Sequence, residues 1–395
     1  MPTTLAGFSP PALIVLGLLF SGGLHGCEAP QTSSDSPAQV PQFEVDSSWQ
    51  WPPELPNDWV VGVVTWVDVD RHDHVWVLHR PRQVPEGLED RAAPPVLEFD
   101  ADGRFVQAWG GPGEGYDWGD MEHSLSVDHQ DNVWITFHNP LERSWAAPVW
   151  RTDDMLLKFT SEGRFVRQLG GRDLYPLADG ANTDTTSVHL ATEATVFPDT
   201  NEVFVADGYG NRRVLVLDAD TLAFKRMWGA FGRQPPPTLG RGADSSANMI
   251  ATTDPEGPEH FNSVHAVKLS RDGLVYVGDR SYRRIQVFTV DGEYVDQVFV
   301  NPAADGFRTT SGLTFSPDPE QRFLYVADYE NGQMHILNRK TLETLGSFGE
   351  LGEAPGQFVG LHTVAADSQG NLWTAETQPK PVGSRVQRLV FKGMS

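Results

Sequence analysis

Cysteine is almost absent from this sequence, since the only one among 395 residues is Cys27. A single cysteine excludes any disulfide within the chain, so the folded domain must be held together by packing and backbone pairing. Basic residues are also scarce, with 30 Lys and Arg against 53 Asp and Glu, and the net charge is −23. Because binding to a phosphate backbone requires clustered positive charge, this composition argues against nucleic acid as a partner.

Long apolar runs are missing as well. The apolar segment at residues 11–19 is too short to span a bilayer. The small residues after it lead to Leu24-His-Gly-Cys27, which resembles the signal of bacterial lipoproteins, where the cysteine after the cut carries the lipid. We therefore expect residues 1–27 to be a lipoprotein-type signal and Cys27 to anchor the protein to a bacterial membrane, at the periplasmic face or the cell surface. The alternative is an ordinary secretory signal, which also exports the chain.

Helical periodicity of useful length is absent, whereas one β pattern recurs six times. Residues 28–42 are polar and rich in Pro and Ser, which predicts a flexible tether before a domain at residues 43–395. In that domain an alternating apolar run, a turn and an aromatic strand repeat as a unit. The six aromatic strands begin at Val75, Val133, Val203, Val275, Leu324 and Leu372.

A second hairpin with an Asp-Gly or Glu-Gly turn follows most of these strands, so each unit is predicted to hold four antiparallel strands. Six such units predict an all-β, six-bladed β-propeller. We expect residues 43–49 to supply the outer strand of the blade that residues 385–391 complete, because closing the ring removes exposed strand edges. A closed ring needs no partner, so a monomer is expected. Long insertions at residues 140–154, 173–190 and 234–259 are typical of loops that shape a site.

Three histidines stand in the same register of the repeat. Aligning the first strands, which line the axis of a propeller, places six residues at one level: Thr65, His123, Glu193, His265, Ser311 and His362. The histidines belong to blades two, four and six, about 120° apart by sixfold symmetry. Three imidazoles facing an axis can bind a metal and leave a fourth position open, as in catalytic zinc sites. Copper, nickel or iron would also suit imidazole ligands. A lone histidine here would instead be a hydrogen-bonded channel residue.

A second ring follows the aromatic strands, at Arg80, His138, Tyr209, Arg280, Tyr329 and Thr377. Arg80 and Arg280 are candidates to hold a carboxylate, although an ion pair between blades would explain either one alone. Glycines on both sides of Tyr209 expose its phenol, and two guanidinium groups would make it a usable base. His79 and His138 are candidate partners of the metal-binding histidines. The remaining histidines are interpreted as solvated: His72, His74, His129, His189, His260 and His335.

Several strings of residues together resemble one family. They are Val77-Leu-His-Arg80, Glu122-His-Ser-Leu125, Ala206-Asp-Gly-Tyr-Gly-Asn-Arg-Arg213, Val264-His-Ala-Val267, Gly278-Asp-Arg-Ser-Tyr-Arg-Arg-Ile-Gln286 and Leu361-His362. Across most of residues 60–391 the chain resembles the NHL-repeat propeller of peptidyl-α-hydroxyglycine α-amidating lyase. The resemblance implies that His123, His265 and His362 hold zinc, that Tyr209 is the base, and that Arg80 and Arg280 assist. The implied reaction cleaves the C–N bond of a carbinolamide, from a peptide or small molecule with a carboxylate, to give an amide and glyoxylate.

One departure concerns calcium. The family has a structural calcium bound by backbone carbonyls, here at Val67 and Leu125, and by an Asp directly after the third histidine. Thr363 stands at that place, which argues against calcium. Two other functions stay open: a metal-dependent lactone or ester hydrolase on the same triad, and a non-catalytic NHL scaffold that binds protein or glycan.

Overall fold

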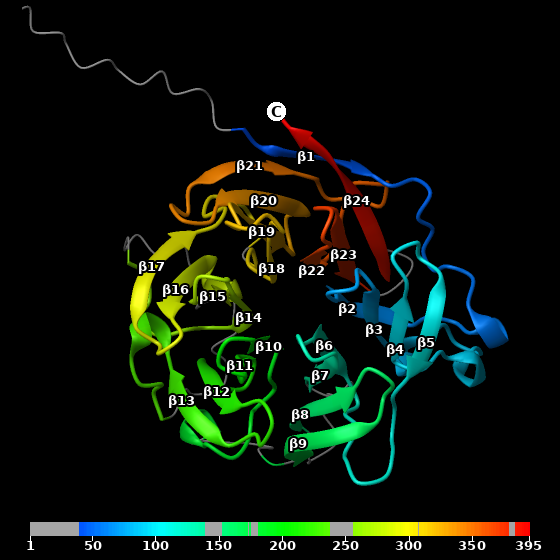
Figure 1. Ribbon diagram of the computed structural model, residues 1–395, viewed down its shortest axis with the longest axis horizontal. Helices are drawn as coiled ribbons and strands as arrows, with labels where there is room; N and C mark the ends of the chain where they lie inside the picture. The colour runs from blue at the N-terminus through cyan, green and yellow to red at the C-terminus, as the bar shows by residue number, and fades with distance from the viewer. Residues whose placement is uncertain are drawn as a thin grey trace, which may run out of the picture. The chain divides into compact units, whose positions relative to one another are not determined.

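A computed structural model describes residues 39–138, 152–172, 174, 181–237, 256–306, 308–378 and 384–395. These residues form six four-stranded antiparallel sheets, arranged as the blades of a ring (Figure 1), so the predicted six-bladed propeller is confirmed. The predicted signal and Cys27 lie outside the described residues. Within the described ranges, no helix has both the length and the apolar character needed to cross a membrane.

The blades follow one another in chain order. Blade one contains β2 (Val63–Val69), β3 (Val75–Arg80), β4 (Val96–Phe99) and β5 (Phe105–Trp109). Blade two contains β6 (Glu122–Val127), β7 (Asn132–Phe137), β8 (Asp153–Thr160) and β9 (Phe165–Arg172). Blade three contains β10 (Glu193–Phe197), β11 (Glu202–Asp207), β12 (Arg213–Asp218) and β13 (Phe224–Trp228).

Blade four contains β14 (Val264–Leu269), β15 (Leu274–Asp279), β16 (Arg284–Thr289) and β17 (Tyr294–Phe299). Blade five contains β18 (Gly312–Phe315), β19 (Phe323–Asp328), β20 (Gln333–Asn338) and β21 (Thr344–Phe348). Blade six contains β22 (Leu361–Ala366), β23 (Leu372–Thr377), β24 (Ser384–Met394) and β1 (Pro41–Val45). The first strand of each blade lies nearest the centre of the ring (Figure 1).

The ring is closed by the first strand of the chain. β1 pairs with β24, with Phe43 opposite Phe391, which confirms the predicted outer strand of blade six. The strand spans Pro41–Val45, whereas Trp49 at the far end of the predicted segment packs edge-to-face on Trp373 with ring centroids 4.8 Å apart. Closure therefore joins the two ends of the domain by pairing and by aromatic packing.

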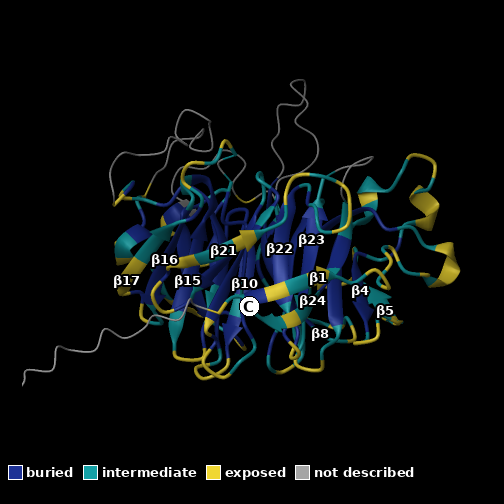
Figure 2. Cartoon of the chain, turned by 90° about the horizontal axis from the view of Figure 1, so that it is seen from above, coloured by how far each residue is buried: buried dark blue, intermediate teal, exposed yellow. Residues whose placement is uncertain are grey.

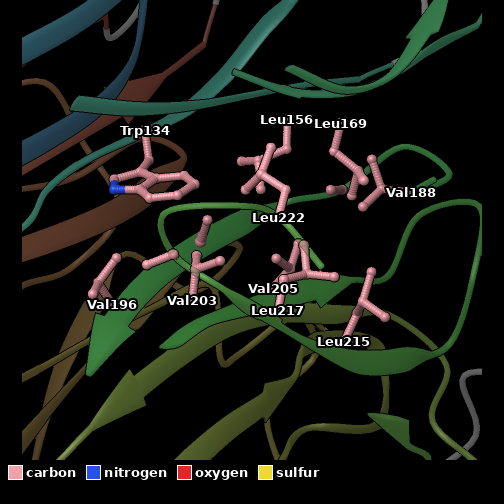
Figure 3. Packing of buried hydrophobic residues seen from close by; sticks show 13 residues of the cluster. Trp134, Leu156, Leu169, Val188, Val196, Val203, Val205, Leu215, Leu217 and Leu222 are labelled. Atoms are coloured by element: carbon pink, nitrogen blue, oxygen red, sulfur yellow. The ribbon is translucent and has the colours of Figure 1, made fainter. Parts of the chain in front are cut away.

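The hydrophobic core consists of packed layers between neighbouring blades. Between blades two and three, Trp134 and Leu156 face Val203 and Leu217 (Figure 3). The first two strands of each blade are buried along most of their length, whereas the outer strands and the turns carry the exposed residues (Figure 2). Because each fully buried large apolar side chain stabilises the fold by about 1.5–3 kcal/mol, these layers fix the blades and the strands at the axis.

The acids that end the second strands are structural. Asp207 pairs with Arg213 at 2.9 Å, and Asp279 pairs with Arg284 at 3.0 Å, with all four side chains fully buried. Each pair links the second strand of its blade to the third. A buried ion pair of this kind is destabilising when one partner is removed. These acids therefore hold the loops after the second strands in place.

Candidate metal centre

The three predicted histidines come together at the axis. The ring centroids of His123, His265 and His362 lie 5.1, 5.0 and 4.9 Å apart, and one nitrogen from each lies within 4.8 Å of the others. Each histidine sits at a β-bulge near the start of its first strand, β6, β14 or β22. A bulge re-aims one side chain out of the regular alternation. The bulges therefore turn all three imidazoles toward one point.

Hydrogen bonds fix the tautomer of each ring. The Nδ1 atom lies 2.8 Å from the Thr192 carbonyl in His123, 2.6 Å from the Ser311 carbonyl in His265, and 2.7 Å from the Thr65 carbonyl in His362. Because a carbonyl oxygen can only accept, each Nδ1 carries the hydrogen and each Nε2 presents a lone pair. Such backbone partners orient metal-binding histidines in proteins.

The carbonyl partners correct one alignment from the sequence. Thr192, not Glu193, is the blade-three residue at the level of the histidines, because Glu193 already pairs with Ala206 inside β10. The turn after β10 is one residue longer than its counterpart in blade two: Val196 pairs with Val203, whereas Val127 pairs with Val133. Counting back a fixed distance from the aromatic strand therefore stopped one residue short of Thr192, at Glu193.

Burial keeps the three imidazoles neutral. It lowers the pKa of His123 and His265 well below the ordinary value, with further lowering from neighbouring cationic groups, and it lowers the pKa of His362 to about 3. No proton then competes for the Nε2 lone pairs at neutral pH. An all-imidazole donor set fits zinc, and also copper, nickel or iron.

A second group with metal-like spacing consists of Asp70 and His74, in the turn between β2 and β3, and Glu98 on β4. Asp70 accepts hydrogen bonds from the backbone N–H of His74 and from the indole of Trp76. Asp128 plays the same part in blade two, where it accepts a hydrogen bond from Trp134. The repetition identifies the Asp70 group as a structural feature of the blade.

Trp66 forms a wall beside the three histidines, which sequence reasoning missed. Its ring centroid lies 5.9, 6.4 and 5.5 Å from those of His123, His265 and His362. The side chain is 1% exposed. Its place directly after Thr65 on a first strand was the available signal. An indole against three imidazoles excludes water from one side of the centre.

Tyr209 brings its phenol to the triad. Its oxygen lies 3.1 Å from Nε2 of His123 and 3.0 Å from Nε2 of His265, and it accepts a hydrogen bond of 2.9 Å from Nη1 of Arg280. The Arg280 guanidinium also lies 5.0 Å from the centre of the Tyr209 ring. The predicted grouping of Tyr209 and Arg280 with the histidines is therefore present, and any group bound at the triad would contact the phenol.

The loop that carries Tyr209 packs closely against Val264 and His189. A Cβ on Gly208 would lie 1.8 Å from the Val264 carbonyl, and one on Gly210 would lie 2.1 Å from the His189 ring. Both glycines are therefore required by close approach. His189 is buried and bonded through Nδ1 to Asp154 at 2.6 Å, so its interpretation as solvated was wrong. His335, 5% exposed and bonded to Asp328, was misjudged in the same way.

Arg80 and Arg280 have no carboxylate within ion-pair distance among the described residues. Arg80 donates from Nε to the Glu122 carbonyl at 3.0 Å, beside His123. Arg280 is 6% exposed, and its Nε is buried and has no hydrogen-bond partner in the described segments. Glu122 acts on Arg80 electrostatically, but neither guanidinium forms an ion pair among the described residues, so both are able to attract an anion. Tyr329 completes this side, with its ring 5.9 Å from His362.

Three predicted residues remain: His79, His138 and Thr377. His79 is structural, because its Nδ1 accepts from the Gly62 N–H and its Nε2 lies 3.0 Å from the Pro94 carbonyl. His138 lies at the centre, with its ring 5.5 Å from His123 and 4.9 Å from Tyr209. Thr377 ends β23 and is only partly buried.

Val67, Leu125 and Thr363 are buried in first strands, but Thr363 has no carboxylate to offer calcium, and the cation of Lys268 is already present among these strands. The ammonium of Lys268 in blade four lies 2.7 Å from Glu193 in blade three. It also interacts with Asp68 in blade one, on the opposite side of the ring. The ion pair of Lys268 and Glu193 therefore lies on the side of these strands that faces the axis.

No family model matches this sequence. The chain is 26% identical over 311 residues to NHL repeat-containing protein 3 of Mus musculus, covering 75% of this chain and 70% of that protein. It is 24% identical over 381 residues to peptidyl-α-hydroxyglycine α-amidating lyase 1 of Drosophila melanogaster, covering 87% of this chain and 60% of the fly protein. The chain thus spans less than two thirds of that lyase.

Among solved structures, an auxiliary nutrient binding protein from Bacteroides thetaiotaomicron superposes with a TM-score of 0.51 at 11% identity, covering 84% of this chain and 70% of that one. This likeness concerns the fold alone. The fold is a six-bladed propeller, and the sequence is similar to NHL-repeat proteins. More specifically, the chain is a homologue, at low identity, of NHL-repeat proteins and of a peptidyl-α-hydroxyglycine α-amidating lyase.

Proposed function

We propose that this protein is a metal-dependent carbon–nitrogen lyase of the amidating-lyase type, with zinc as the metal. Its substrate is a small molecule or peptide that carries a carbinolamide and a carboxylate. The observation that carries the proposal is the contact of one phenol oxygen, that of Tyr209, with two metal-binding nitrogens and the Arg280 guanidinium. A simple metal-binding scaffold has no need of that arrangement.

Each residue has a separate task in this reaction. The metal, when bound, supplies a Lewis acid for an oxygen of the substrate. Tyr209 takes the proton of the substrate hydroxyl, and the Arg280 hydrogen bond stabilises the phenolate. Arg80 and Arg280 attract the carboxylate. Trp66 keeps water from one side of the centre, which strengthens these electrostatic interactions.

The proposal includes the setting of the enzyme. Cys27 would be lipidated after cleavage of the signal, and the tether would hold a monomeric propeller at a bacterial membrane. The substrate would then be met outside the cytoplasm. Labelling with a radioactive fatty acid in cells, with Cys27→Ser as the control, tests this part independently of the reaction.

The test of the reaction is incubation of the zinc-loaded protein with α-hydroxyhippurate and measurement of glyoxylate. Glyoxylate and benzamide in equal amounts are expected. If a lactone or ester is hydrolysed instead and no glyoxylate forms, the hydrolase is the correct function. Similarity to NHL repeat-containing protein 3 favours a scaffold as the second candidate, and a protein that neither binds metal nor turns over any of these compounds would establish it.

A further inference from the structure

One imidazole nitrogen at the centre has no hydrogen-bond partner among the residues that the structure describes. His138 directly follows β7, and its main chain is fixed by the hydrogen bond from its N–H to the Met121 carbonyl at 3.0 Å. Its ring lies against Tyr209 and His123, yet its Nδ1 is buried and has no hydrogen-bond partner within the described part of the chain. The backbone therefore holds an unsatisfied imidazole nitrogen beside the proposed base.

This nitrogen differs from those of the other buried imidazoles at or near the centre. The Nδ1 atoms of His123, His265 and His362 each face a carbonyl, and both nitrogens of His79 have partners. Leaving a buried polar atom without a partner costs about 1–3 kcal/mol. Such an atom in a native protein needs an explanation, such as strain, a bound water or ion, or a catalytic role, and its place beside Tyr209 favours the last.

His138 is not a fourth metal ligand. Among the described residues, the group of nitrogens that lie within 4.8 Å of one another contains His123, His265 and His362 but not His138. The ring instead stands beside Tyr209, on the side where Arg80 and Arg280 act on it electrostatically. A substrate bound at the triad beside Tyr209 would thus meet His138 with a part other than the one at the metal.

In its neutral form the His138 imidazole carries one N–H, and the buried Nδ1 is the nitrogen that is free to donate it. A neutral donor is ill suited to the carboxylate, for which two guanidinium groups are present. It suits an uncharged acceptor that gains negative charge during the reaction. In a carbinolamide, that acceptor is the carbonyl oxygen of the acyl amide.

We propose that His138 donates a hydrogen bond from Nδ1 to the acyl carbonyl oxygen of the substrate, and so binds and stabilises the leaving amide. This role rests on the proposed lyase function. The substrate hydroxyl gives its proton to Tyr209, its oxygen becomes the aldehyde oxygen of glyoxylate, and the C–N bond breaks. The bonding electrons pass to nitrogen and are shared with the carbonyl oxygen, where His138 acts. Tyr209 then returns the proton to nitrogen.

Binding of unreactive probes tests this contact without catalysis. Hippurate carries the acyl amide and the carboxylate, whereas 4-phenylbutyrate has a chain of similar length without the amide. The zinc-loaded wild type should bind hippurate about tenfold more tightly than 4-phenylbutyrate, the equivalent of one hydrogen bond. His138→Phe should abolish this preference, and His138→Asn, which keeps an N–H near Nδ1, should retain part of it.

Calorimetry gives the affinities, and zinc content and melting temperature show that both variants fold. An unchanged preference for hippurate in His138→Phe, or no binding of hippurate by the wild type, would overturn the proposal. The probes do not react, so binding and catalysis are tested separately. If the preference for hippurate depends on His138 but the lyase assay gives no product, the reaction is refuted and the contact between His138 and the acyl group is not. If the lyase is active but the preference for hippurate is the same in wild type and His138→Phe, only the contact between His138 and the acyl group is refuted.

Leaving-group effects separate a catalytic role from a structural one. With α-hydroxyhippurates substituted on the benzoyl ring, the loss of kcat/KM in His138→Phe should reach about 10²-fold for electron-donating 4-methoxy, a typical effect of removing one such donor. It should be smaller for electron-withdrawing 4-nitro, whose leaving amide needs less help. A loss that is equal across the series would contradict the proposed donor.

Discussion

Replacing Tyr209 with Phe removes one oxygen from the centre and leaves the ring in place. That oxygen is the acceptor for Arg280 at 2.9 Å and lies about as close to two of the histidines. The ring contacts with His123, His138 and His265, at 4.9–5.5 Å between centroids, do not depend on it. The substitution is therefore a test of chemistry with little change in packing.

Two magnitudes follow from these contacts. Arg280 loses its acceptor inside the protein, which should lower the free energy of unfolding by about 1–3 kcal/mol. The reaction loses its base, which should lower kcat by about 10²–10⁴-fold. The rate effect corresponds to about 3–5 kcal/mol in the activation barrier. Bound zinc should be unchanged, because the ligands are the three histidines.

The assay compares glyoxylate release by wild type and Tyr209→Phe at saturating α-hydroxyhippurate and equal zinc content. Tyr329→Phe is the matched control, because Tyr329 also lies beside the triad but accepts its hydrogen bond from Gln378. Its loss of activity should be much smaller. If Tyr209→Phe kept its kcat within a factor of about three, general base catalysis by this phenol would be refuted.

Burial lowers the pKa of His79 to about 4, so its neutral form adds stability above pH 6.5 that is lost as the pH falls toward 4. The difference in unfolding free energy between wild type and His79→Asn should shrink by about 3 kcal/mol over that range in denaturant titrations, and a constant difference would contradict this assignment. Gly210→Ala should reduce kcat without loss of zinc, because its Cβ would meet the His189 ring; full activity would show that the loop can yield. Calcium should not raise the melting temperature, because Lys268 already supplies a cation among the first strands, and a clear rise would indicate a calcium site.

The fold could be predicted because each blade repeats the same alternation and turn. The histidines were placed correctly for a similar reason: blades two, four and six share one turn length, so equal spacing along the chain means equal height on the axis. Blade three has a longer turn, and there the same count selected Glu193 in place of Thr192.

Features that depend on contacts between distant segments could not be predicted. The bulges that aim the histidines leave no recognisable sequence signal, and neither do the carbonyls that fix their tautomers. His189 lies in an insertion before a strand, where the sequence predicts a solvated residue. In the structure the loop that carries Tyr209 covers His189. His138 was expected to support the metal-binding histidines, and only its surroundings show that Nδ1 has no partner.

The most direct measurement is the metal content of the purified protein and of three single variants, His123→Ala, His265→Ala and His362→Ala, by mass spectrometry after expression in zinc-replete medium. Wild type should carry about one zinc per chain, and each variant should lose most of it, because two imidazoles hold zinc far less tightly than three. A wild-type content below about 0.2 per chain, or variants that keep their zinc, would contradict a metal centre on these histidines.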